Sequence, residues 1–191
     1  MERIIGHVLF FVLILGELGL IILLALYVVS TIQSFLAGAP YVPISRKLVW
    51  QLLRFGRVGP TDVLYDLGCG DARVLLGGVR QCGVRRAVGY EVSWWPYLKA
   101  KFLIRRSGLG NQVTLYRRNF LGADLSDATV IFLYLFPKLV DRAARYLAGS
   151  TKPGIRILCA SFPIDHTRRP GFRLLQSEKI GTITAYLYER I

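Results

Sequence analysis

The chain has 191 residues, enough for one domain with a buried core and one further segment. It carries 25 Lys and Arg against 12 Asp and Glu, a net charge of +13, while 53% of its residues are hydrophobic. This combination argues against an ordinary soluble enzyme and fits a protein on an anionic membrane. Nucleic-acid binding explains the charge but not the apolar excess, which gathers at one end of the chain.

The amino-terminal segment, residues 4–35, is almost wholly apolar and exceeds the roughly 20 residues that span a bilayer as a helix. A cleaved signal peptide is the alternative, because Ala37, Gly38 and Ala39 resemble a cleavage site. The apolar run is longer than the about 7–15 residues of a signal sequence, and Pro40 disfavours cleavage. We therefore predict one retained transmembrane helix.

Charges on the two sides of this segment predict its orientation. Arg3 stands nearly alone before it, whereas four basic residues follow it: Arg46, Lys47, Arg54 and Arg57. Because basic flanks stay inside, the rest of the chain is expected to face the cytoplasm or a matrix-equivalent side. The cysteines lack metal-ligand spacing and predict reduced thiols with no metal site: Cys69, Cys82 and Cys159.

One acidic residue, Glu17, lies inside the apolar segment. A carboxylate in mid-membrane is costly and marks a functional position by default, here a partner for another membrane helix or for a substrate helix. A protonated carboxyl, hydrogen-bonded or drawn toward a water defect, is the simpler alternative. The sequence leaves both open.

A short connection and a helix are predicted to follow. Pro40 and Pro43 fix their own φ and disfavour helix before them, and Ser45 has the side chain of an N-cap for a helix that ends near Phe55. The predicted domains are an anchor over residues 1–38, a linker with a pre-core helix over 39–56, and a main domain over 57–191.

In the main domain, strand-like and helix-like runs alternate. Strands are predicted at residues 63–67, 87–91, 113–116, 129–135 and 155–159, and helices at 73–82, 96–107 and 137–147. This alternation predicts an α/β fold whose mostly parallel sheet is covered on both faces. Residues 172–177 and 183–189, around Gly181, predict a terminal antiparallel hairpin at the sheet edge.

The turn after the first predicted strand is the most informative motif. The apolar run of this strand ends at an acid, Asp66, and passes at once into a turn with Gly68 and Gly70, and the next strand-like run closes at a second acid, Glu91. Glycines allow a backbone to approach a ligand closely and to adopt positive φ, so the motif predicts a nucleotide-type pocket. A dinucleotide-binding fingerprint requires a further glycine or alanine where Arg73 stands.

The pattern resembles the S-adenosylmethionine (SAM) dependent methyltransferases with a Rossmann-like fold; another α/β nucleotide fold or an inactive site is the alternative. The resemblance implies that the first acid and its glycines border the methionine part of SAM, and that Glu91 accepts from both ribose hydroxyls. It also places Asn119 and Phe120 at the adenine. Asn119 stands where an acid is usual. The alternatives are an ordinary asparagine in a turn for Asn119 and a core aromatic residue for Phe120.

The same resemblance places methyl transfer at the tip of the fourth predicted strand. Tyr134 is the candidate catalytic residue there and would orient the nucleophile, while Phe136 would wall its channel; core packing is the alternative for both. Asp165 or His166 would receive a proton, unless both simply belong to a surface turn. The Asn/Asp-Pro-Pro-Tyr/Phe motif of adenine, cytosine and glutamine N-methyltransferases is absent.

A membrane helix, Tyr41-Val42-Pro43, Asp-x-Gly-x-Gly-Asp-x-Arg and the late Phe162-Pro163 occur in this order. The series resembles the membrane-anchored lysine methyltransferases of the ATP synthase c-subunit and the adenine nucleotide translocase, and their prokaryotic relatives. That resemblance makes Tyr41 and Pro43 a lid at the methionine end of SAM. It gives the cofactor to Asp66, Gly68, Gly70, Asp71 and Glu91. Ala72 departs from a common glycine.

The resulting hypothesis is a membrane-anchored SAM-dependent methyltransferase acting on a lysine amine of a membrane protein. Methylation of a lipid or hydrophobic small molecule, and a non-catalytic SAM-fold membrane adaptor, are the alternatives. No nucleic-acid partner is expected. Four basic residues in one predicted helix are expected to face anionic headgroups, or else to form a solvated helix face: Lys99, Lys101, Arg105 and Arg106.

Overall fold

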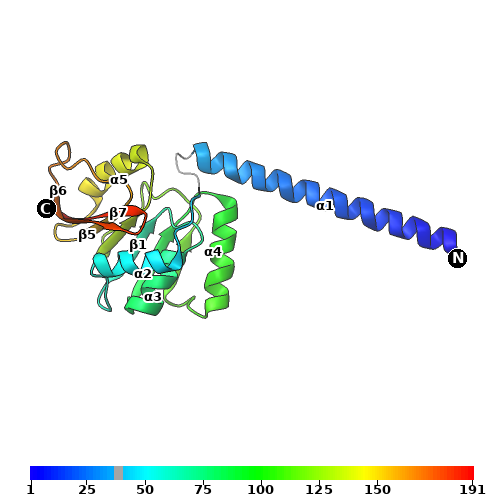
Figure 1. Cartoon of the computed structure of the whole chain (residues 1–191), viewed down its shortest axis with the longest axis horizontal. Coiled ribbons are helices and arrows are strands. Elements are labelled where there is room, and N and C mark those ends of the chain that lie inside the picture. The colour runs from blue at the N-terminus through cyan, green and yellow to red at the C-terminus, as the bar shows by residue number, and fades with distance from the viewer. Residues whose placement is uncertain (37–40) are drawn as a thin grey trace.

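The computed structural model describes residues 1–36 and 41–191. One long helix, α1 (Glu2–Leu36), projects from a compact α/β body (Figure 1). Its stretch Arg3–Ile32 is long and apolar enough to cross a membrane. The expected boundary at residue 38 and the segment around Pro40 lie outside the described residues.

In the described part of the chain, seven strands form one sheet in the order β3-β2-β1-β4-β5-β7-β6. The strands are β1 (Val63–Leu67), β2 (Arg86–Tyr90), β3 (Val113–Tyr116), β4 (Val130–Leu133), β5 (Arg156–Ala160), β6 (Phe172–Ile180) and β7 (Ile183–Arg190). The first five are parallel to one another, while β7 runs antiparallel to both β5 and β6. The predicted sheet with its terminal hairpin is confirmed.

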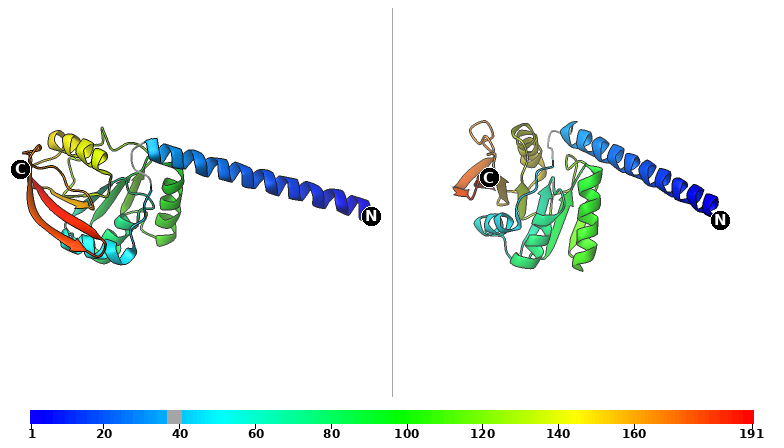
Figure 2. Two further views of the ribbon diagram at one scale, coloured as in Figure 1. Left: turned by 45° about the horizontal axis from the view of Figure 1, so that its top comes forward. Right: turned by 45° about the vertical axis from the view of Figure 1, so that its right-hand side comes forward.

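Helices cover the sheet on both faces (Figures 1 and 2). One face carries α2 (Arg46–Phe55), α3 (Arg73–Cys82) and α4 (Trp94–Ser107), which share a buried cluster with β1, β2, β4 and β5. The other face carries α5 (Pro137–Ser150). Ser45 caps α2 as predicted, since its hydroxyl accepts from the Leu48 amide at 3.3 Å.

Among the elements that differ from their predicted bounds, β4 and α4 matter most at the edge where the parallel strands end. β4 ends at Leu133, so Tyr134 and Leu135 leave the sheet. α4 begins at Trp94, two residues before Pro96. Proline is tolerated there, because the amide groups of the first helical turn have no intrahelical partner to lose.

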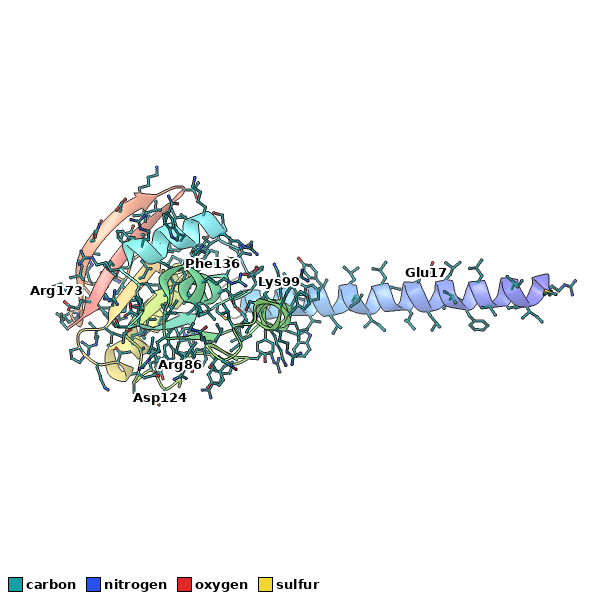
Figure 3. The ribbon with its side chains drawn as sticks, turned by 90° about the horizontal axis from the view of Figure 1, so that it is seen from below. Glu17, Arg86, Lys99, Asp124, Phe136 and Arg173 are labelled. Atoms are coloured by element: carbon teal, nitrogen blue, oxygen red, sulfur yellow. The ribbon has the colours of Figure 1, made fainter. Side chains whose placement is uncertain are left out.

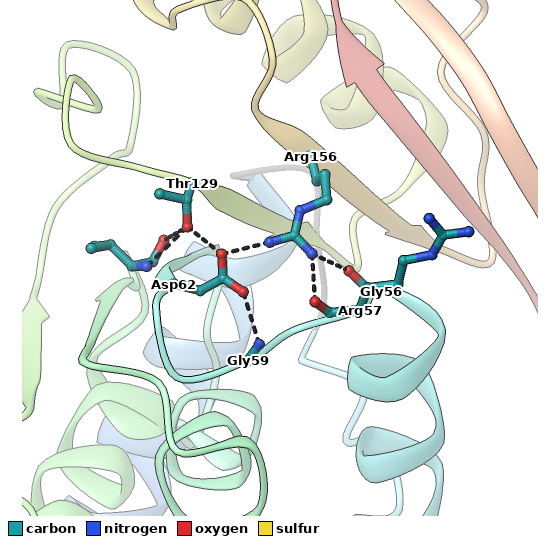
Figure 4. A network of polar contacts seen from close by, with 7 residues as sticks. Gly56, Arg57, Gly59, Asp62, Thr129 and Arg156 are labelled. Carbon is teal, nitrogen blue, oxygen red and sulfur yellow. Dashed lines mark hydrogen bonds and ion pairs between the residues drawn. The ribbon is translucent and has the colours of Figure 1, made fainter.

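The opposite edge of the sheet is fastened by a buried polar network (Figure 4). The Asp62 carboxylate accepts from the Thr129 hydroxyl at 2.7 Å, from the Gly59 amide at 2.8 Å and from the Arg156 guanidinium at 2.5 Å. Burial raises the pKa of Asp62, but these three donors outweigh it and hold the pKa below its ordinary value. The network joins the segments that enter β1, β4 and β5.

Candidate functional site

A cleft with about 1060 Å³ of empty space, its open mouth included, lies at the carboxyl ends of β1, β2 and β4. The structure brings to it every residue predicted for the cofactor and the candidate for catalysis: Tyr41, Pro43, Asp66, Gly68, Gly70, Asp71, Glu91, Asn119, Phe120 and Tyr134. The position agrees with the rule that open α/β sheets bind ligands where their strands end.

The turn after β1 needs its glycines for both conformation and space. Gly68 has φ 115° and Gly70 has φ 54°. A Cβ at Gly70 would lie 2.7 Å from the Tyr41 ring, and one at Gly68 would lie 2.8 Å from Leu135. Ala72 also adopts positive φ, 63°, so the position that departs from a common glycine keeps the glycine-type conformation. The missing Cβ atoms let Tyr41 and Leu135 pack closely on this turn.

Glu91 links this turn to the end of β2. One carboxylate oxygen accepts from the Gly70 amide at 3.0 Å and the other from the Ser93 amide at 2.7 Å. Burial raises the pKa of Glu91, and these backbone donors partly oppose that shift. The Ser93 hydroxyl and the Val92 amide act on this pKa in the same direction. Glu91 lines the cleft, and a carboxylate there can accept from ligand hydroxyls.

Asp66 is the buried acid best suited to a cationic ligand. Its residue is 2% exposed, it lines the cleft, and no described residue donates a hydrogen bond to its carboxylate. Burial, followed by the negative charges of Glu91 and Asp71, raises its pKa well above the ordinary value. A positively charged ligand would relieve this cost. The amino group or sulfonium of SAM has that charge, so the site fits the cofactor.

Asp71 has a comparable burial and the opposite electrostatics. Arg73 lies 2.6 Å and Lys99 3.0 Å from its carboxylate. Burial raises the pKa of Asp71, but hydrogen bonds from Arg73, Tyr41 and Lys99 hold it well below its usual range. Arg73 also donates to the Ile44 carbonyl, so this cluster fastens the segment of residues 41–44 over the glycine turn.

Sequence reasoning missed the role of Lys99. The sequence predicts that Lys99 faces headgroups together with three other basic residues. In the structure its ammonium instead pairs with Asp71 and lies 5.6 Å from the centre of the Tyr41 ring. Figure 3 labels Lys99 near the carboxyl-terminal end of α1. The sequence near Asp71 offers only Arg73 as a basic partner. Nothing in it predicts a contact with Lys99, which lies 28 positions later, in α4.

The adenine-side residues differ in how they meet the cleft. The Asn119 side-chain oxygen accepts from the Leu121 amide at 3.0 Å, so it caps its own turn and keeps one further acceptor site. Phe120 is 7% exposed and belongs to the core, although it also lines the cleft. A structural role, in a turn for Asn119 and in the core for Phe120, is therefore compatible with a contact to a ligand at both positions.

Aromatic side chains form the other part of the cleft. Phe136, labelled in Figure 3, stacks on Phe162 with ring centres 5.9 Å apart, and Tyr134 lines the same cleft. Asp165 instead bonds Thr167 and pairs with Arg168. Neither Asp165 nor His166 is among the described residues that line the cleft, so the structure gives them no part in it.

Sequence comparisons identify relatives of the chain. Residues 66–170, more than half of the chain, match the ANTKMT methyltransferase domain family. A protein-lysine N-methyltransferase of Saccharolobus islandicus (strain REY15A) is 31% identical over 132 residues, covering 69% of this chain and 82% of that protein. The Mus musculus adenine nucleotide translocase lysine N-methyltransferase is 30% identical over 125 residues, covering 65% of this chain and 54% of that protein.

A further relative and a solved structure agree with these. The Xenopus laevis lysine N-methyltransferase of the ATP synthase c-subunit is 26% identical over 147 residues, covering 74% of this chain and 63% of that protein. The chain thus spans less than two thirds of both vertebrate relatives. An RNA methyltransferase from Salinibacter ruber in complex with S-adenosyl-L-homocysteine has a TM-score of 0.71 and 28% identity, covering 78% of this chain and 94% of that one.

The strand order, the glycine turn with its two buried acids and the sequence relationships lead to one assignment. The chain is a SAM-dependent methyltransferase. It belongs to the ANTKMT methyltransferase domain family of protein-lysine N-methyltransferases.

Proposed function

We propose that the protein is anchored in a membrane by α1 and transfers a methyl group from SAM to a lysine amine of a membrane protein. The observation that carries this proposal is a helix able to span a bilayer that packs directly on the body bearing the cleft. Two relatives, named for the adenine nucleotide translocase and for the ATP synthase c-subunit, support a membrane-protein substrate.

The proposed arrangement has an anchor over residues 1–38, a linker and helix over 39–56, and the methyltransferase domain over 57–191. The basic residues after the span support a domain on the cytoplasmic or matrix-equivalent side, where anionic headgroups would attract them. The helix of the middle segment, α2, packs on the domain through Val49, Leu52 and Leu53. Anchor and cleft are then joined through residues 41–44, which line the cleft.

The cofactor supplies an electrophilic methyl group. In our proposal Asp66 pairs with the cationic methionine end of the cofactor, and Gly68 and Gly70 let the cofactor approach the backbone closely. Tyr41 and Pro43 cover this end, and Asp71 holds Tyr41 in place.

The rest of the cofactor is proposed to meet the ends of the next strands. Glu91 accepts from the ribose hydroxyls, and Asn119 and Phe120 border the adenine. These residues supply alignment, which is worth several kcal/mol in such transfers.

The aromatic side of the cleft is proposed to receive the acceptor lysine. Its amine must be neutral to attack, and desolvation between Phe136 and Phe162 disfavours the ammonium form. The Tyr134 hydroxyl would orient the amine toward the methyl group, and the proton would leave to water. This division predicts that substitutions at Phe136 lower methyl transfer without weakening cofactor binding.

The full chain, reconstituted in lipid nanodiscs with methyl-labelled SAM, tests the function against its alternatives. The acceptors are a membrane-spanning peptide with a lysine near the bilayer surface, its Lys→Arg version, the nanodisc lipids and a transfer RNA. We expect label on the lysine peptide alone, and none with the Glu91→Ala chain. Label in lipid or RNA would contradict a lysine substrate, and absence of SAM binding by the folded chain would favour the adaptor.

A further inference from the structure

The outward face of α4 is apolar. Pro96, Ala100 and Ile104 are buried against the sheet. On the opposite side of the helix, Trp95 is 48%, Leu98 36% and Phe102 61% exposed. At 100° per residue these three side chains fall in one ridge that points away from the core. An exposed ridge of large apolar residues on a charged protein marks a contact surface.

Basic side chains flank this ridge. Lys101, Arg105 and Arg106 are exposed, and none has an acidic partner within ion-pair distance among the described residues. Beside the first turn, the Arg117 guanidinium lies 4.9 Å from the centre of the Trp94 ring. An apolar strip bordered by cations, with tryptophan at one end, is the composition of a helix that lies in a membrane interface.

The ridge is continuous with the anchor. The Tyr27 and Trp95 rings meet edge to face, with centres 6.5 Å apart, and the Trp95 amide donates to the Ser30 hydroxyl at 3.0 Å. Tyr27 and Ser30 lie near the end of the candidate span, at the level where a bilayer surface would be. In Figures 1 and 2, α4 runs crosswise to α1 and is the helix of the body beside it. A helix placed so lies along a membrane that α1 crosses.

We propose that α4 is a second membrane contact, whose ridge of Trp95, Leu98 and Phe102 enters the headgroup region of an anionic bilayer. Lys101, Arg105 and Arg106 then pair with lipid phosphates beside it. This inference rests on the proposed membrane span. Because Lys99 of the same helix holds Asp71 at the cleft, docking of α4 fixes the distance of the cleft from the bilayer. The acceptor lysine is therefore one that lies close to the membrane surface.

Fluorescence quenching by lipids brominated on the acyl chain tests this in proteoliposomes of the full chain. The chain has three tryptophans, so Trp50→Phe with Trp94→Phe leaves Trp95 as the reporter. The matched control keeps Trp50, which is 39% exposed on α2, and replaces the other two. A third chain reports on the span, with Leu15→Trp in a background where all three tryptophans are Phe. We expect quenching of Trp95 and of the Leu15→Trp reporter, and none of Trp50.

Charge reversal tests the lipid headgroups. Arg105→Glu is expected to lower the docked-to-undocked ratio reported by Trp95 at least about fivefold in vesicles rich in phosphatidylserine. The control is Arg173→Glu, because Arg173 lies at the end of the body far from α1 (Figure 3). This substitution should leave the docked-to-undocked ratio unchanged. If the quenching of Trp95 does not depend on the phosphatidylserine content of the vesicles, the proposed pairing with headgroups is wrong.

Two further results separate this inference from the proposed anchor. An unquenched Trp95 beside a quenched Leu15→Trp reporter would overturn membrane docking of α4 while leaving the anchor in place, and the ridge would then serve a protein partner. An unquenched Leu15→Trp reporter would refute the span itself, and the docking inference with it.

Discussion

Two acids on either side of the glycine turn show how neighbours, more than burial, set the state of a carboxylate. Asp66 and Asp71 are 2% and 3% exposed, yet the pKa of the first is raised and that of the second is lowered. Asp71 has Arg73 and Lys99 beside it, whereas the described residues give Asp66 only like charges. Asp71 is consequently suited to hold structure, and Asp66 to receive a cation.

Binding of SAM is therefore predicted to release protons. Because its pKa is raised, Asp66 keeps its proton to a higher pH in the free protein than an ordinary carboxyl does, and a cationic ligand lowers that pKa by stabilising the ionised form. Proton release should grow, and affinity should fall, as the pH is lowered toward the pKa of the free protein. Titration calorimetry in two buffers of different ionisation enthalpy measures the release.

Asp66→Asn is the control, because Glu91 also has a raised pKa and stays in place. The variant should bind SAM more weakly and release fewer protons. Equal release by both chains would remove Asp66 from the cationic subsite.

Gly70→Ala is predicted to weaken SAM binding through Tyr41. The substitution introduces a side chain at φ 54° and a Cβ only 2.7 Å from the Tyr41 ring, so the segment above the turn must move. Gly108→Ala is the matched control, since Gly108 has φ 73° and no atom within 4 Å of an added Cβ. Both changes should cost about 1–2 kcal/mol of stability through backbone strain. SAM titration should separate them, and equal affinities would contradict a covering role for Tyr41.

At the scale of the elements, the sheet has one edge for stability and another for chemistry. The Asp62 network joins the segments entering β1, β4 and β5, while the cleft lies where β1, β2 and β4 end. Substitutions at the two edges should therefore separate folding from binding.

Asp62→Asn is predicted to lower the free energy of unfolding by about 2–4 kcal/mol, because it leaves the partly buried Arg156 without its anion. SAM affinity should be nearly unchanged. The folded-state pKa of Asp62 is lowered, so its stabilisation is present above the unfolded pKa of about 4 and is lost as the pH falls toward the folded one. The variant should then lose less stability on acidification than the wild type.

Urea unfolding at several pH values measures this, with the exposed Asp124 as the site of a control, Asp124→Asn. A wild type and an Asp62→Asn chain with parallel acid dependence would contradict the role of the network.

Local patterns explain why most elements could be predicted. The capped helix after Ser45, the strand that contains Asp66 and the helix starting at Arg73 each carry their signals within a few residues. The contact of Lys99 with Asp71 could not be predicted, since it depends on how α4 packs beside the glycine turn. The exposed apolar ridge of α4 could not be predicted for the same reason. The sequence shows the charges of that helix, but packing on the sheet decides which of its faces is buried.

For the whole molecule, the anchor and the body form one functional unit in this account. α1 meets α4 through Tyr27 and Ser30, and α4 reaches the cleft through Lys99. In our proposal, a cleft held at this place would select acceptors by their position at the membrane as well as by their chemistry. The proposed chemistry needs SAM bound with the help of Glu91 and a neutral lysine amine in the aromatic part of the cleft.

The most direct measurement is mass-spectrometric mapping of heavy methyl groups after the full chain and deuterated-methyl SAM are incubated with membranes of the source cells. We predict heavy methyl on lysine of one or a few membrane proteins, close to the bilayer surface, and its loss with the Glu91→Ala chain. Heavy methyl confined to lipid, RNA or soluble proteins, or transfer that persists in the Glu91→Ala chain, would contradict the account.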